Sequence, residues 1–162
     1  MGSPFLDEVY SRVDFDRGLV FKFFVIFSLF EYALKQAGFY TAGRSGEAQP
    51  DWEGFANSIY PQFSAQATPE LAIAVNYMLN RPVMKQVPLN NALGFVQRQR
   101  PRNMNDTVWL SVLVRGVRNN LFHGGKFRYD RPRDTELIQY SLIILEAWAK
   151  CNNDVRIVLE AV

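Results

Sequence analysis

The chain has 162 residues, of which 48% are hydrophobic and 21% are charged, and its formal net charge is +2. These values are ordinary for one folded domain and exclude a protein that binds nucleic acid through a strongly basic overall charge. The one His and the one Cys, His123 and Cys151, exclude an internal disulfide and a metal site built from several Cys or His residues of one chain. Arg outnumbers Lys 13 to 5, and Arg is the residue that forks onto phosphate oxygens.

The length predicts a single domain over residues 15–162, preceded by an N-terminal extension over residues 1–14. No signal peptide is visible. The longest uncharged apolar run near the start, residues 23–30, is far shorter than the about 20 residues that a membrane span needs. We therefore expect a cytoplasmic protein that makes no membrane contact.

A long helix is predicted over residues 16–36, where apolar residues cover nearly the whole circumference. In so small a domain, this pattern indicates a central helix or a helix that gives one face to a partner subunit. The following residues, 38–50, are predicted to form a loop because they are rich in Gly and polar residues. A short helix comes next, capped by Asp51 and closed by Pro61.

Thr68 and Pro69 mark a strong helix start, and this helix is predicted to end before Pro82. Residues 84–105 form the least regular stretch, with room for one short helix over residues 89–96. No segment shows the convincing alternation of apolar and polar residues that is typical of a strand.

A further helix is predicted to be capped by Asp106 or Thr107 and to end at the Gly pair of residues 124–125. Its apolar residues lie within a narrow arc: Leu110, Leu113, Val114, Val117 and Leu121. The last helix is capped by Asp134 and runs as far as Leu159. Together these elements predict an all-α bundle of about five helices with long first and last helices.

The helix predicted to follow Asp106 or Thr107 ends in a polar string, Arg118-Asn119-Asn120-Leu121-Phe122-His123-Gly124-Gly125-Lys126. Arg118 can hold the non-bridging oxygens of a phosphodiester and stabilise the charge of the transition state. His123 can take the proton of a 2′-hydroxyl or protonate the leaving oxygen, because the ordinary pKa of His lies near 6.5. RNA supplies its own nucleophile, so this route needs no metal. One His cannot easily be both base and acid, whereas a symmetric dimer supplies two.

The spacing from Arg118 to His123, with Asn119 after the Arg, matches the Arg-x(4–6)-His motif of the HEPN superfamily. In this motif the chain resembles members of that superfamily. The string over residues 118–126 resembles one HEPN subgroup found in prokaryotic defence and toxin–antitoxin settings, and residues 30–35 look like that subgroup as well. The resemblance implies a compact all-α, HEPN-like helical bundle that forms homodimers. In many such domains the paired motifs make a metal-independent endoribonuclease site. An antitoxin or a nucleotidyltransferase is the protein partner that such settings imply.

We therefore expect a metal-independent endoribonuclease without a cofactor, which cleaves single-stranded or loop RNA at a composite homodimer site and acts as a toxin or defence effector. The predicted catalytic residues are Arg118 and His123. The predicted supporting residues are Asn119, Asn120 and Glu31, of which Glu31 is the natural ion-pair partner of Arg118. The predicted RNA contacts are Arg115, Lys126, Arg98, Arg100 and Arg102.

Each assignment has a purely structural alternative. His123 can bond helix-end carbonyls, Arg118 can serve in an ion pair with Glu31, and the other cations can be solvated charges. The two Asn residues can be ordinary helix-end amides, and Cys151 is expected to be a buried thiol. For the whole chain, one alternative is a non-catalytic HEPN module that binds RNA, nucleotide or a partner protein. Another is a helical bundle that binds a small molecule in its aromatic interior.

Overall fold

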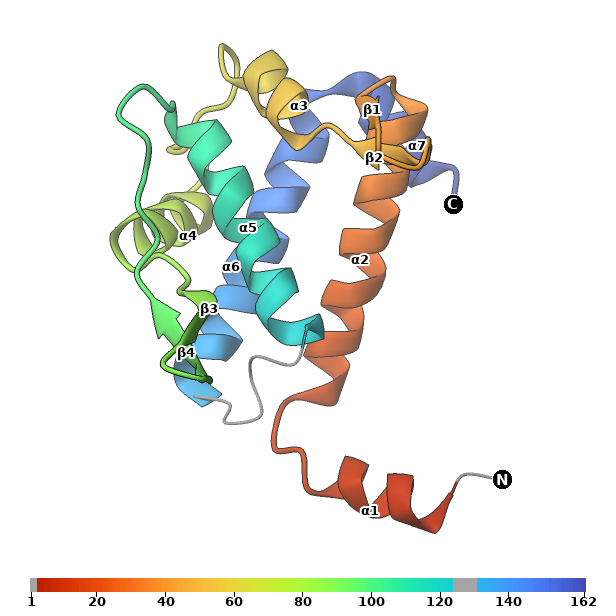
Figure 1. The fold of residues 1–162 in the computed structure, drawn as a ribbon. Helices are drawn as coiled ribbons and strands as arrows, with labels where there is room; N and C mark the ends of the chain where they lie inside the picture. The colour runs from red at the N-terminus through yellow and green to blue at the C-terminus, as the bar shows by residue number, and fades with distance from the viewer. Residues whose placement is uncertain (1–2, 124–130) are drawn as a thin grey trace.

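The computed structural model describes residues 3–123 and 131–162, which form seven helices and two antiparallel hairpins (Figure 1). The helices are α1 (Pro4–Ser11), α2 (Arg17–Gln36), α3 (Trp52–Ile59), α4 (Pro69–Asn80), α5 (Asp106–Phe122), α6 (Arg131–Cys151) and α7 (Asn153–Glu160). The strands are β1 (Tyr40–Ala42) paired with β2 (Ala48–Pro50), and β3 (Lys85–Leu89) paired with β4 (Ala92–Val96). The described chain is therefore α+β, and the predicted all-α bundle of about five helices is wrong.

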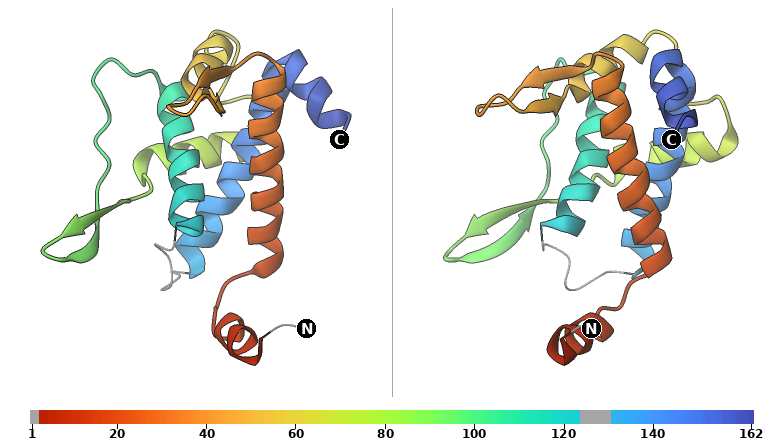
Figure 2. Two further views of the ribbon diagram at one scale, coloured as in Figure 1. Left: turned by 45° about the vertical axis from the view of Figure 1, so that its right-hand side comes forward. Right: turned by 90° about the vertical axis from the view of Figure 1, so that its right-hand side faces the viewer.

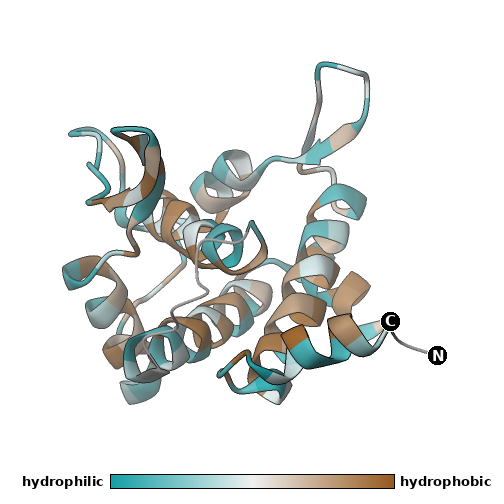
Figure 3. Cartoon of the chain, turned by 60° about the horizontal axis from the view of Figure 1, so that its bottom comes forward, coloured by the Kyte–Doolittle hydropathy of each residue, from teal (hydrophilic) through white to brown (hydrophobic). Residues whose placement is uncertain are grey.

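Three long helices, α2, α5 and α6, run side by side through the body of the molecule (Figures 1 and 2). Helix α3 packs on α5, α4 packs on α6, and α7 packs on α2. Hydrophobic and hydrophilic stretches alternate along the helices, as amphipathic helices around one core require (Figure 3). Helix α1 stands off the body with no buried residue, and the β3–β4 hairpin projects on another side.

Aromatic rings from α2, α3 and α6 form the centre of the core. Trp52 stacks on Phe30 with ring centroids 5.4 Å apart and an interplanar angle of 8°. Phe55 makes edge contacts with Phe30 and with Trp148. These side chains are at most 2% exposed, and aromatic rings contribute the largest buried areas of any side chains. The stack therefore fixes α3 against α2 and α6.

Side-chain caps explain where the helices begin. Asp51 and Thr68 each accept a hydrogen bond from the backbone N–H three residues later, which confirms both predicted caps. Helix α5 is capped by Asn105, one residue before the predicted Asp106 or two before Thr107. Each of these helices therefore begins within two residues of its predicted start, because the capping side chain determines where the helix begins.

Two hairpins occupy segments that are predicted to be a loop, residues 38–50, or irregular, residues 84–105. Strands β3 and β4 pair around Asn90 and Asn91, whose φ angles are 46° and 63°. Asn tolerates this left-handed region, which a two-residue type I′ hairpin turn requires at both central positions. The short helix predicted over residues 89–96 is therefore wrong. No residue of the four strands is buried, so the alternation that marks a half-buried strand does not arise.

The predicted single last helix is two helices. Helix α6 ends at Cys151. Asn152 has an extended backbone, at φ −130° and ψ 113°, and caps α7 because its side-chain Oδ1 accepts a hydrogen bond from the N–H of Val155. Asn side chains that bond nearby backbone in this way compete with the helix, which explains the break. Asp134, predicted to cap the last helix, lies within α6 and is buried. The Gly pair predicted to end α5 lies outside the described residues.

Helix α2 buries one side and leaves another uncovered. Its buried residues are Phe23, Phe27, Phe30, Ala33 and Leu34. By contrast, Phe21 is 68% exposed and Phe24 is 47% exposed. This helix is long and apolar, yet none of the described helices meets the length and hydropathy that crossing a membrane requires. Helix α2 thus has more apolar surface than the core of one chain covers.

Other side chains pack closely against Gly116 on α5. A Cβ atom at this position would lie 2.8 Å from Val83 Cγ1 and 2.9 Å from Arg98 Nη2. We expect overpacking in Gly116→Ala to lower the free energy of unfolding by about 1–3 kcal/mol. The higher helix propensity of Ala offsets up to about 1 kcal/mol of this loss. Urea unfolding measures the change.

Gly18→Ala is the matched control, because a Cβ there meets only Asp16 Oδ1, at 3.4 Å. This variant should be as stable as the wild type or more stable. If Gly116→Ala gains stability to the same degree as Gly18→Ala, the close packing at Gly116 is disproved.

Candidate functional site

Helix α5 has a buried face and an outer face. Leu110, Leu113 and Val114 are fully buried. The outer face of α5 is defined by five residues, of which Arg118 is half-buried and the others are exposed: Arg115, Arg118, Asn119, Phe122 and His123. Because the apolar residues lock the rotation of the helix about its axis, the polar residues take fixed positions on the surface.

The predicted catalytic pair is in contact. Arg118 Nη1 lies 3.4 Å from His123 Nε2 and donates a hydrogen bond to Asn119 Oδ1 at 3.1 Å. The Arg118 guanidinium carbon lies 5.7 Å from the centre of the Phe27 ring on α2, within reach of a cation–π interaction. Thus one ring and one amide position Arg118, and its guanidinium reaches the imidazole across the end of the helix.

The chemistry of Arg fixes the roles in this contact. A guanidinium only donates, so a hydrogen bond across this contact requires Nε2 of His123 to accept and the neutral ring to carry its proton on Nδ1. His123 also ends the helix, since its backbone N–H donates to the carbonyl of Asn119 at 2.9 Å. An unprotonated Nε2 beside a fixed positive charge is an arrangement that can accept a proton next to a bound anion.

An exposed aromatic cluster borders this pair. Phe24 on α2 and Phe122 on α5 meet edge to face with ring centroids 5.2 Å apart, and Phe122 is 40% exposed. Phe21, three residues before Phe24, continues the exposed surface. These residues were not among the predicted site residues, although the nearly all-apolar pattern of the first long helix is a signal that points to them. We call Phe21, Phe24 and Phe122 the Phe cluster.

Two predicted supporting residues serve other contacts. Glu31 Oε1 accepts a hydrogen bond from the indole Nε1 of Trp52 at 3.1 Å, and the expected Glu31–Arg118 ion pair is not formed in the described structure. Asn120 is buried and donates to the carbonyl of Met84 at 2.9 Å. Of the three predicted supporting residues, the structure brings only Asn119 to Arg118.

The five predicted RNA contacts have different surroundings. Arg100 pairs with Asp106 at 2.6 Å and donates to the carbonyl of Met104. Arg98 is half-buried against Gly116, beside Arg115. Arg102 is exposed in the turn before α5. Lys126 lies outside the described residues.

No group of three or more His, Cys, Asp or Glu side chains within the described residues could hold a metal ion. Cys151, expected to be buried, is half-buried, and burial raises the pKa of its thiol. Its backbone carbonyl accepts a hydrogen bond from Gln62. In the described structure Cys151 therefore has the surroundings of an unreactive structural thiol.

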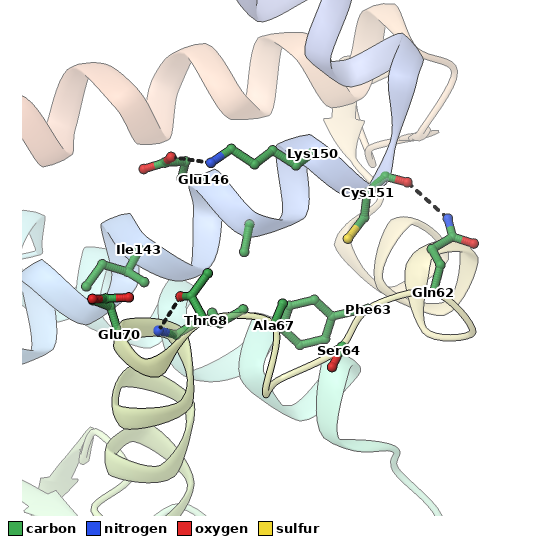
Figure 4. Close-up of a pocket in the computed structure, with 12 residues that line it drawn as sticks. Gln62, Phe63, Ser64, Ala67, Thr68, Glu70, Ile143, Glu146, Lys150 and Cys151 are labelled. Atoms are coloured by element: carbon green, nitrogen blue, oxygen red, sulfur yellow. Dashed lines mark hydrogen bonds and ion pairs between the residues drawn. The ribbon is translucent and has the colours of Figure 1, made fainter.

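Two open hollows lie away from the outer face of α5. One, of about 500 Å³, lies between α6 and the segment that joins α3 to α4 (Figure 4). The Lys150–Glu146 ion pair of 2.6 Å and Cys151 line one of its walls. The other, of about 650 Å³, lies between α2, α6 and α7 and is lined by Ile26, Leu142 and their neighbours. Both have the size of ligand sites, and neither includes a predicted site residue.

Comparison with family models, with curated proteins and with solved structures found no match to this chain. The most specific geometry on the surface is the Arg118–His123 contact beside the Phe cluster.

The contact of Glu31 with Trp52 gives a prediction. Glu31→Ala removes the acceptor of an indole that is 2% exposed, and leaving this donor unpaired should cost about 1–3 kcal/mol of unfolding free energy. Glu31→Gln keeps an oxygen that accepts the bond, so its stability should lie close to that of the wild type. Urea unfolding of both variants measures the difference. Equal stability of Glu31→Ala and Glu31→Gln would show that the bond contributes nothing.

Proposed function

We propose that the chain is a metal-independent endoribonuclease that cleaves single-stranded or loop RNA and is related to the HEPN superfamily. The observation that carries this proposal is the 3.4 Å contact between Arg118 Nη1 and His123 Nε2 on the exposed end of α5. An Arg and a His in contact on an open surface supply two of the groups that phosphodiester cleavage by an internal nucleophile needs, an anion-binding cation and a base. A toxin or defence role, with an antitoxin or nucleotidyltransferase partner, rests on the resemblance of the motif.

The proposed reaction uses the atoms of the contact directly. RNA displaces His123 from Arg118, whose guanidinium then binds the non-bridging oxygens of the scissile phosphate. Nε2 of His123 takes the proton of the 2′-hydroxyl as its oxygen attacks phosphorus. The bond from phosphorus to the 5′-oxygen breaks, and the leaving oxygen takes a proton from an acid. The products are a 2′,3′-cyclic phosphate and a 5′-hydroxyl.

A homodimer supplies the acid as the protonated imidazole of a second His123, which gives its proton to the leaving 5′-oxygen and becomes neutral. The chain contains one His, and a two-fold axis beside α5 would place a second His123 opposite the first. The Phe cluster supports this arrangement, because it leaves apolar rings uncovered next to the Arg118–His123 pair and such patches mark association surfaces. Both copies would then bury the same cluster around one composite site.

Substitution of the pair tests the proposed catalysis. Arg118→Ala and His123→Ala should each lower the rate of RNA cleavage in EDTA at least about 100-fold, because each removes a group that acts in the transition state. Arg44→Ala removes an exposed Arg from the turn of the β1–β2 hairpin and should leave the rate unchanged. A gel assay on labelled RNA measures the rates. Cleavage at the wild-type rate by either site variant would rule out the proposed chemistry.

The dimer has its own test. Phe21→Asp places a charge in the Phe cluster, so burying that surface becomes costly and sedimentation velocity should show a shift from dimer to monomer with loss of cleavage. Ile73→Asp is the matched control, since Ile73 on α4 is 58% exposed and lies outside the cluster. A wild-type chain that cleaves RNA as a monomer would refute the composite site.

The second candidate function is a non-catalytic module that binds nucleotide, RNA or a partner protein. The hollows of about 500 Å³ and 650 Å³ favour it, because they offer ligand-sized sites away from His123. Under this alternative, the protein would bind a ligand tightly while no RNA is cut.

A further inference from the structure

Arg98 lies against the part of α5 that carries Arg115 and Arg118. The guanidinium of Arg98, which follows β4, lies against the backbone of α5 at Gly116. Gly116 makes this approach possible, because any Cβ there would come within 2.9 Å of Arg98 Nη2. The next residue back along the helix is Arg115, whose charge acts on Arg98. A strand segment and a helix therefore bring two positive charges together.

This pair is unfavourable in the absence of an anion. Arg98 is half-buried, and its Nε atom has no hydrogen-bond partner within the described structure. Burial first, and then the charge of Arg115, lower the pKa of Arg98 below its usual range. Arg100, two residues on, is paired with Asp106, but no carboxylate in the described residues pairs with Arg98 or Arg115. The surroundings thus hold two cations together without the acid that would offset their repulsion.

We propose that Arg98 and Arg115 form a phosphate-binding subsite, which holds the phosphate of a nucleotide next to the one that is cleaved. An anion between the two guanidinium groups relieves their repulsion and accepts charge-assisted hydrogen bonds from both. Arg115 and Arg118 lie three residues apart on α5 and are therefore neighbours on its surface. The subsite thus continues the site from the scissile phosphate toward the base of the β3–β4 hairpin.

This inference rests on the proposed function, because it takes RNA as the ligand. Of the five predicted RNA-binding cations, it assigns one phosphate contact to the pair of Arg98 and Arg115. It also explains why a Gly occupies the middle of a buried helix, where it weakens the helix itself: the missing side chain makes room for Arg98 as well as for Val83.

The test measures binding without cleavage. The probe is a fluorescein-labelled 12-nucleotide oligouridine with 2′-O-methyl groups, which removes the nucleophile, and its affinity is followed by anisotropy over a range of salt concentrations. Arg115→Gln and Arg98→Gln should each weaken binding about tenfold. Each should also lower the slope of log affinity against log salt by about 0.7, the value for one phosphate on a single strand. Arg115 is exposed, so its variant remains informative if Arg98→Gln is unstable.

Two comparisons make the result specific. Arg44→Gln, which removes one charge from the other hairpin, should keep the wild-type slope. The double variant of Arg98 and Arg115 should lose no more slope than either single variant, because both residues hold the same phosphate. Unchanged slopes in both single variants, an equal loss in Arg44→Gln, or twice the loss in the double variant would each overturn the subsite.

Cleavage of unmodified RNA by the wild-type protein separates the two proposals. If that RNA is not cut while the slopes change as expected, the subsite stands and the nuclease fails. If the RNA is cut while the slopes stay unchanged, the nuclease stands and the subsite fails.

Discussion

The packing of α5 is the constraint on which the rest of the structure depends. Leu110, Leu113 and Val114 hold one face of this helix in the core, and Gly116 lets Val83 and Arg98 approach its backbone more closely than any other residue would. With its rotation fixed, the helix presents Arg118 and His123 at its exposed end. A core interaction therefore determines the geometry of a surface site.

The charges around this helix are distributed unevenly, and the distribution has a physical cause. Arg100 is neutralised by Asp106 where the chain enters α5, and Glu31 is occupied by the indole of Trp52. These contacts stabilise the fold and leave Arg98, Arg115 and Arg118 without acids in the described structure. Positive charge is thus concentrated on the outer face of α5 and next to it at Arg98, where a polyanion would relieve the repulsion. The Phe cluster borders the same face.

The sequence predicted the parts of the fold that local chemistry decides. Asp51 and Thr68 cap helices because their side chains satisfy backbone donors three residues on. The β3–β4 hairpin could not be predicted from apolar alternation, because its strands are not buried and its register depends on the Asn90–Asn91 turn. The break at Asn152 depends on one extended residue within a continuous apolar pattern. The periodicity of apolar residues likewise could not show that Glu31 contacts Trp52. That pattern indicates which face of a helix is buried, but it does not determine how one helix is rotated and shifted against another.

The central claim is that this helix end cuts RNA through the 2′-hydroxyl. The most direct measurement incubates the wild-type protein with RNA in EDTA, then repeats the reaction with a single 2′-deoxy nucleotide at the position of any cut, and identifies the product ends by mass spectrometry. The proposed chemistry predicts a 2′,3′-cyclic phosphate and a 5′-hydroxyl from the unmodified RNA and no cut at the substituted position in the deoxy RNA. Cleavage at the deoxy position, or a product with a 5′-phosphate, would contradict it.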